Sequence, residues 1–108
     1  MLDILIRGGE VVTPQGCGVY DVGISGEKIV AVDKAGALRA DENARIIDAD
    51  GKIVMPGGID PHVHCSWHIP AIEGVPAQLT APPAQVSRAA LYGGTTTMID
   101  FAAWEEEE

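Results

Sequence analysis

Two histidines separated by a single residue are the feature of this 108-residue sequence best suited to chemistry. They are His62 and His64, and Asp60 lies two positions before the first. Side chains two apart on a β-strand point to the same face, so these three groups are expected to project together. Two imidazoles in successive layers can bind one ion, with each nitrogen roughly 2.0–2.1 Å from zinc. The spacing therefore predicts His62 and His64 as metal ligands, with Asp60 as an acceptor that orients an imidazole.

A histidine pair of this kind is by itself weak evidence, because surface or strand-capping histidines show the same spacing. The preceding segment, Pro-Gly-Gly-Ile-Asp-Pro at positions 56–61, favours the metal interpretation. It fixes where the strand begins and places the pair at the strand's C-terminal end. In β/α barrels the active site is built at that end of the strands.

Three further side chains are candidates for the same site. Trp67 and His68 follow the pair in the next loop and are predicted to line a substrate pocket, although a plain loop position is the simpler interpretation of His68. Asp100 ends a later strand, where it could accept a hydrogen bond from a metal ligand or from backbone donors. Cys65 is interpreted as a packing thiol, because free cysteine behaves mostly as a small hydrophobe.

The first half of the chain is predicted to be a small antiparallel sheet or half-sandwich. Apolar and β-branched runs are divided by glycine-rich turns, which is typical of hairpins. Gly8-Gly9 is predicted to end the first strand, and Asp50-Gly51 to form the turn of the last hairpin. The predicted strands are 2–7, 10–13, 19–24, 28–32, 45–48 and 52–55.

From Pro56 onward the pattern changes to strand, helix, strand. Residues 57–64 and 95–101 are the predicted strands, and 84–92 is a helix between a first-turn proline and a glycine pair. Such a βαβ unit is the building block of a parallel sheet or barrel. The predicted domain boundary therefore separates residues 1–55 from residues 56–108.

The amino-acid composition excludes some classes of binding partner and indicates a cellular compartment. The formal net charge is −9, to which the run Glu105–Glu108, read as a solvated face, contributes four charges. This balance argues against nucleic-acid or anionic-membrane partners. No apolar run is long enough to span a bilayer and no export signal is recognisable, so a cytoplasmic protein with Cys17 and Cys65 as free thiols is expected.

Three stretches together resemble the amidohydrolase superfamily, closest to its dihydropyrimidinase and hydantoinase branch. They are the segment 56–64, the opening Ile-Leu-Ile-Arg-Gly-Gly-Glu-Val-Val-Thr at 4–13, and Ala-Leu-Tyr-Gly-Gly-Thr-Thr-Thr-Met-Ile-Asp-Phe at 90–101. The resemblance implies a β-sandwich segment followed by the first βαβ unit of a TIM-type (β/α)8 barrel. Because such a barrel needs about 250 residues, the resemblance implies an incomplete metallo-dependent hydrolase fold, and we expect this chain to be the N-terminal part of a longer enzyme.

The resemblance also implies a function and a cofactor. The full-length protein would hydrolyse C–N bonds of cyclic amides or ureides with two Zn²⁺ per subunit, as a homotetramer or homodimer. His62 and His64 would bind the more buried ion. The family's carboxylated lysine, two further histidines and late aspartate have no counterpart here, so this chain alone is expected to be inactive.

Three alternatives stay open. Dihydroorotase-like and allantoinase-like relatives are less favoured, because they usually carry an arginine where this sequence has Ser66. A non-catalytic scaffolding relative of dihydropyrimidinase would have lost its metal ligands, whereas both histidines are retained. A third alternative is a small β-rich binding protein, for which a cooperative melt of the isolated chain would be the evidence.

Overall fold

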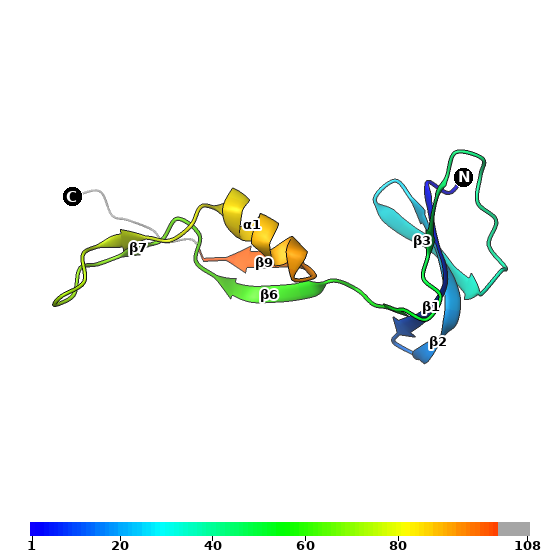
Figure 1. Ribbon diagram of the computed structural model, residues 1–108, viewed down its shortest axis with the longest axis horizontal. Helices are drawn as coiled ribbons and strands as arrows, with labels where there is room; N and C mark the ends of the chain where they lie inside the picture. The colour runs from blue at the N-terminus through cyan, green and yellow to red at the C-terminus, as the bar shows by residue number, and fades with distance from the viewer. Residues whose placement is uncertain (102–108) are drawn as a thin grey trace. The chain divides into compact units, whose positions relative to one another are not determined.

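The computed structural model describes residues 1–101 of the chain. The predicted solvated run Glu105–Glu108 lies outside the described residues. Contacts divide the chain into two compact units, Met1–Pro56 and Gly57–Glu108 (Figure 1). Each unit is built around its own sheet.

The sheet of the first unit has five strands centred on β1 (Ile4–Thr13). β1 pairs antiparallel with β2 (Gly16–Ser25), which pairs antiparallel with β3 (Lys28–Lys34). The predicted hairpin between residues 19–24 and 28–32 is therefore confirmed. On the other side of β1 lie β4 (Arg45–Asp48) and β5 (Ile53–Val54), both parallel to it.

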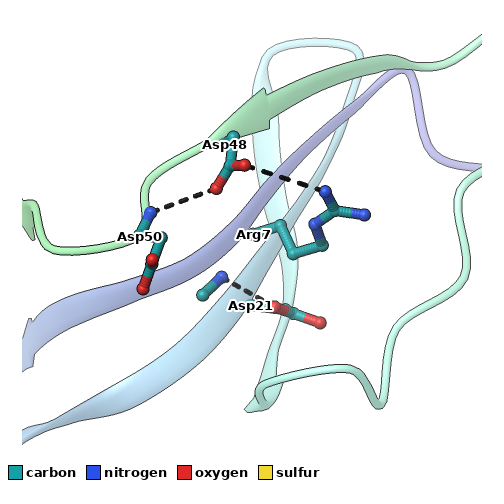
Figure 2. A network of polar contacts seen from close by, with 5 residues as sticks. Arg7, Asp21, Asp48 and Asp50 are labelled. Carbon is teal, nitrogen blue, oxygen red and sulfur yellow. Dashed lines mark hydrogen bonds and ion pairs between the residues drawn. The ribbon is translucent and has the colours of Figure 1, made fainter.

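The predicted hairpin around Asp50-Gly51 is wrong. β4 and β5 do not pair with each other; they pair one after the other along the same edge of β1, with Ile4 opposite Arg45 and Glu10 opposite Ile53. The Asp48 carboxylate accepts the Asp50 N–H at 3.1 Å, an Asx turn that carries the chain forward between the two short strands (Figure 2). The sheet is therefore mixed and not antiparallel.

The prediction that Gly8-Gly9 ends the first strand is also wrong. β1 runs through both glycines and shifts register between Ile6 and Gly9, which is a β-bulge. Gly8 has a φ of 70°, a left-handed conformation that glycine adopts without steric cost. The glycine pair bends the strand and does not interrupt it.

A buried carboxylate holds this bulge in place. Asp21 on β2 is fully buried, and its Oδ1 accepts the Gly8 N–H at 3.0 Å (Figure 2). Its Oδ2 accepts the Gly36 N–H at 2.8 Å. Each oxygen thus satisfies a backbone donor at a bend of the chain. The nearby ion pair between Arg7 and Asp48, 3.9 Å apart with both side chains more than half exposed, contributes little.

One face of this sheet is apolar and uncovered by the described residues. Among those residues, the fully packed apolar side chains are Leu5, Val11, Val22 and Ala49. By contrast Ile29 and Met55 are 66% and 68% exposed. They line an open hollow of 590 Å³ whose walls are otherwise mostly aliphatic. The sheet therefore has the one-sided apolar surface that a second layer would bury.

The second unit contains the predicted βαβ arrangement. β6 (Gly58–Val63) pairs parallel with β9 (Thr95–Asp100), and α1 (Pro83–Tyr92) connects them and packs on β9 (Figure 1). Pro83 stands in the first turn of the helix, and the Gly93 N–H closes its last turn on the carbonyls of Ala89 and Ala90. The described residues hold one such unit, whereas a full barrel needs eight.

The segment between β6 and α1 is more regular than its three prolines suggest. β7 (His68–Ile69) and β8 (Gln78–Leu79) form a short antiparallel pair, and an isolated bridge joins Ile72 to Val75 near the tip. This hairpin leaves β6 directly after the histidine pair and returns to the helix. Within residues 1–101, no helix combines the length and the apolar character needed to cross a membrane.

Candidate metal centre

The two histidines stand where β6 and β9 end together. β6 ends at Val63, so His62 is the last residue but one of the strand and His64 is the first residue after it. Val63 lies opposite Asp100, and the carbonyl of Val63 accepts the Phe101 N–H at 3.3 Å. The parallel pairing thus brings the carboxyl ends of both strands to one edge, as the sequence predicted.

The imidazoles face one another through the same ring nitrogen. His62 Nε2 and His64 Nε2 are 3.1 Å apart, and the rings are nearly perpendicular at 82° with centroids 5.0 Å apart. Two nitrogens bound to one tetrahedral zinc ion at 2.0–2.1 Å would be about 3.4 Å apart. The spacing therefore fits two ligands of one ion after a shift of a few tenths of an ångström. In the absence of an ion, it also fits one imidazole N–H donating to the other ring.

The two aspartates predicted to orient the imidazoles hold the backbone around them. Asp60 Oδ1 accepts the N–H of His62 at 3.1 Å. Asp100 Oδ1 accepts the N–H groups of Cys65 at 3.2 Å and of Phe101 at 2.9 Å. Within residues 1–101 neither carboxylate is hydrogen-bonded to an imidazole. Both aspartates fix the strand ends from which the histidines project.

Aromatic rings pack against the pair. The Phe101 ring is centred 4.5 Å from that of His62 and 5.0 Å from that of His64. Trp67 is centred 4.6 Å from His64. Sequence reasoning singled out Trp67 as a pocket residue but missed Phe101. The signal for Phe101 was its position directly after Asp100, at the end of the strand parallel to β6.

His68 is placed differently. It lies in β7 opposite Leu79, is exposed, and has no hydrogen bond or ring contact with His62 or His64 in the described part of the chain. Its assignment to a substrate pocket therefore stays a prediction.

Cys65 does not complete the donor set. Both cysteines are free, and Cys65 is half-buried. Partial burial raises the pKa of the Cys65 thiol, and the negative charge of Asp100 and a hydrogen bond to its carboxylate raise it further. Because metals bind the thiolate, this environment favours the packing role predicted for Cys65. No cluster of three or more histidine, cysteine, aspartate or glutamate side chains suited to a metal occurs among residues 1–101.

Known proteins are similar in sequence to this chain over nearly its whole length. The chain is 39% identical over 98 residues to a dihydropyrimidinase of Arabidopsis thaliana, covering 91% of this chain and 17% of the relative. It is 41% identical over 102 residues to a D-hydantoinase of Ralstonia pickettii, covering 93% and 20%. This chain is a homologue of the dihydropyrimidinases and D-hydantoinases. No protein-family model matches it.

Solved structures agree on the fold. A D-hydantoinase (dihydropyrimidinase) from Thermus sp. superposes with a TM-score of 0.76 at 35% identity, covering 94% of this chain and 20% of that one. The hydantoinase homologue described here thus spans about a fifth of the length of the relatives it matches, in their N-terminal part. An allantoinase of Salmonella choleraesuis is also similar, at 34% identity over 105 residues, 92% of this chain and 19% of the relative.

Proposed function

We propose that this hydantoinase homologue is the N-terminal portion of a metal-dependent hydrolase that cleaves C–N bonds of cyclic amides. The single observation that carries the proposal is the pair of facing Nε2 atoms of His62 and His64, 3.1 Å apart. They stand at the carboxyl end of a parallel strand, which is where β/α barrels bind their substrates. The similarity to hydantoinases and dihydropyrimidinases supports a cyclic amide as the substrate.

In this proposal His62 and His64 hold one of two Zn²⁺ ions of the full-length subunit. Bound zinc polarises a carbonyl and lowers the pKa of water, which is the chemistry amide hydrolysis requires near neutral pH. The chain's own residues position that ion. Asp60 and Asp100 hold the strand ends through backbone N–H groups, and Phe101 packs on both imidazoles.

The two units take different parts in the proposed enzyme. Met1–Pro56 contributes to a small β-sandwich domain, whose second layer would cover the open apolar face bearing Ile29 and Met55. Gly57 onward begins the catalytic (β/α)8 barrel. A homotetramer or homodimer in the cytoplasm is the proposed form of the full-length protein.

A hydrolysis assay on the full-length protein tests the function. We expect hydantoin or a dihydropyrimidine to be opened, and activity to be lost on dialysis against dipicolinate and regained with Zn²⁺. Allantoin serves as the comparison substrate, and we expect it to be hydrolysed more slowly because Ser66 stands where allantoinase-like enzymes usually carry an arginine. A protein without stoichiometric metal and without activity on any of the three would instead be the scaffolding relative.

A further inference from the structure

The turn that follows His64 is backbone-strained. Ser66 has a φ of 50° and is the one non-glycine residue with a left-handed φ among residues 1–101. This conformation is uncommon for residues with a side chain, and it persists only where the surroundings hold it. The turn connects the second histidine of the pair to Trp67, which packs on that histidine's ring.

One side chain spans this turn from the base of the β7–β8 hairpin, where the chain leaves β8. The Thr80 hydroxyl donates to the carbonyl oxygen of His64 at 2.6 Å and accepts the N–H of Trp67 at 2.7 Å. Two backbone bonds flank it: the Thr80 N–H donates to the Trp67 carbonyl at 3.0 Å, and the Ser66 N–H donates to the Ala81 carbonyl at 3.0 Å. The hydroxyl thus closes the turn by bonding the residues on both sides of Ser66.

His64 depends on such an outside contact. It follows the last residue of β6, and the register of β6 with β9 ends at Val63 opposite Asp100. The register is irregular between Asp60 and Val63 and gives His62 no partner in β9. The His62 N–H is nevertheless held by Asp60 Oδ1 within the strand, whereas His64 lies beyond the strand. Metal ligands need to be held within about 0.5 Å of their productive positions, so the backbone of His64 needs a second anchor.

We propose that Thr80 is a positioning residue of the metal centre, whose hydroxyl fixes the backbone of His64 so that its Nε2 meets that of His62. This inference rests on the proposed function, because it concerns the same histidine pair. It assigns a role to the hairpin as well. The β7–β8 hairpin begins after His64 and brings Thr80 back to the metal centre, where Thr80 holds the backbone of His64.

Substitution of Thr80 with its near-isostere valine tests this role. The readout is the affinity of the full-length apoprotein for Co²⁺, followed by the visible absorption of the bound ion, with folding checked by circular dichroism. We expect Thr80→Val to weaken Co²⁺ binding about 10-fold, the lower end of the effects seen when residues that orient metal ligands are replaced. Thr80→Ser keeps the hydroxyl and is expected to restore affinity to within about 3-fold.

Thr13 provides a matched control in the first unit. Its hydroxyl makes the same two kinds of bond across a turn, donating to the Gly16 carbonyl at 2.8 Å and accepting the Gln15 N–H at 3.2 Å. Thr13→Val removes an equivalent pair of bonds, so a purely structural effect would appear in both variants. We expect Thr13→Val to leave the Co²⁺ affinity and absorption spectrum unchanged.

The outcomes separate the inference from the function on which it rests. If His62→Ala loses Co²⁺ while Thr80→Val binds it like the unaltered protein, the role of Thr80 is overturned and the metal centre stands. If His62→Ala and His64→Ala both bind Co²⁺ normally, the metal centre itself is overturned. Should Thr80→Val fail to fold, the comparison is repeated in a Ser66→Gly background, because glycine adopts the left-handed turn without strain.

Discussion

Replacing His62 or His64 with alanine is expected to abolish both metal binding and hydrolysis in the full-length protein. Each substitution removes one of the two Nε2 atoms that face each other across 3.1 Å. Mutating a residue that hydrogen-bonds a metal ligand typically lowers the affinity for the metal by 10–100-fold. Loss of a ligand itself should therefore lower the zinc affinity by more than about 100-fold. Zinc content after gel filtration and the rate of hydantoin hydrolysis are the two measurements.

His68→Ala is the control for this pair. It removes an imidazole from the same stretch of chain, but His68 lies in β7 opposite Leu79 and has no described contact with the pair. We expect its zinc content to match that of the unaltered protein. Normal zinc content in both His62→Ala and His64→Ala would contradict the assignment.

Substitution of Asp21 is expected to cause the second large effect, a loss of folding stability. Both carboxylate oxygens accept a backbone N–H, from Gly8 and from Gly36, and the residue is fully buried. Asp21→Asn keeps the shape but turns one acceptor into an NH₂ donor that faces an N–H. One buried group then lacks a partner, which should lower the free energy of unfolding by about 1–3 kcal/mol. Asp21→Ala leaves both N–H groups unsatisfied and should cost more.

Urea denaturation followed by circular dichroism measures this loss. Asp33→Asn is the matched control, because Asp33 is exposed and its Oδ1 accepts only the N–H of the adjacent Lys34 in the described structure. A change within about 0.5 kcal/mol is expected there, as for most surface substitutions. Equal effects of Asp21→Asn and Asp33→Asn would show that Asp21 does not secure the bulge at Gly8.

The second unit follows from local sequence signals. Pro83 and Gly93 bound the helix, the β-branched run after it forms β9, and the Pro-Gly-Gly segment before the histidine pair marks the start of β6. A helix between two strands leads to parallel pairing, and parallel pairing places His62 and Asp100 at one edge. The location of the candidate site was therefore predictable without long-range information.

The first unit shows where local signals are insufficient. Asp50-Gly51 is a strong hairpin signal, yet β4 and β5 each pair with β1. A short segment pairs with whichever strand has a free edge in the fold, and that strand can be distant in the sequence. Here the partner of β4 is β1, about 40 residues earlier in the chain. Gly8 was misread for a similar reason, since a bulge and a strand end need the same backbone freedom.

The contacts that complete the site are also long-range. Thr80 reaches the His64 carbonyl across 16 residues, and Asp100 reaches the Cys65 amide across 35. No periodicity or motif in the sequence identifies Thr80, which follows β8, as the residue that closes the turn before β7. These residues become recognisable as part of the site only once the strands and the hairpin are placed.

Histidine side-chain nitrogen NMR during a Zn²⁺ titration of the full-length protein tests the central claim most directly. The facing Nε2 atoms predict that the Nε2 resonances of His62 and His64 shift together, and that in the zinc-bound protein both imidazoles carry their proton on Nδ1. The resonances of His68 should not move. If His62 and His64 show no shift, or if zinc binds through Nδ1, the two histidines are not the metal pair proposed here.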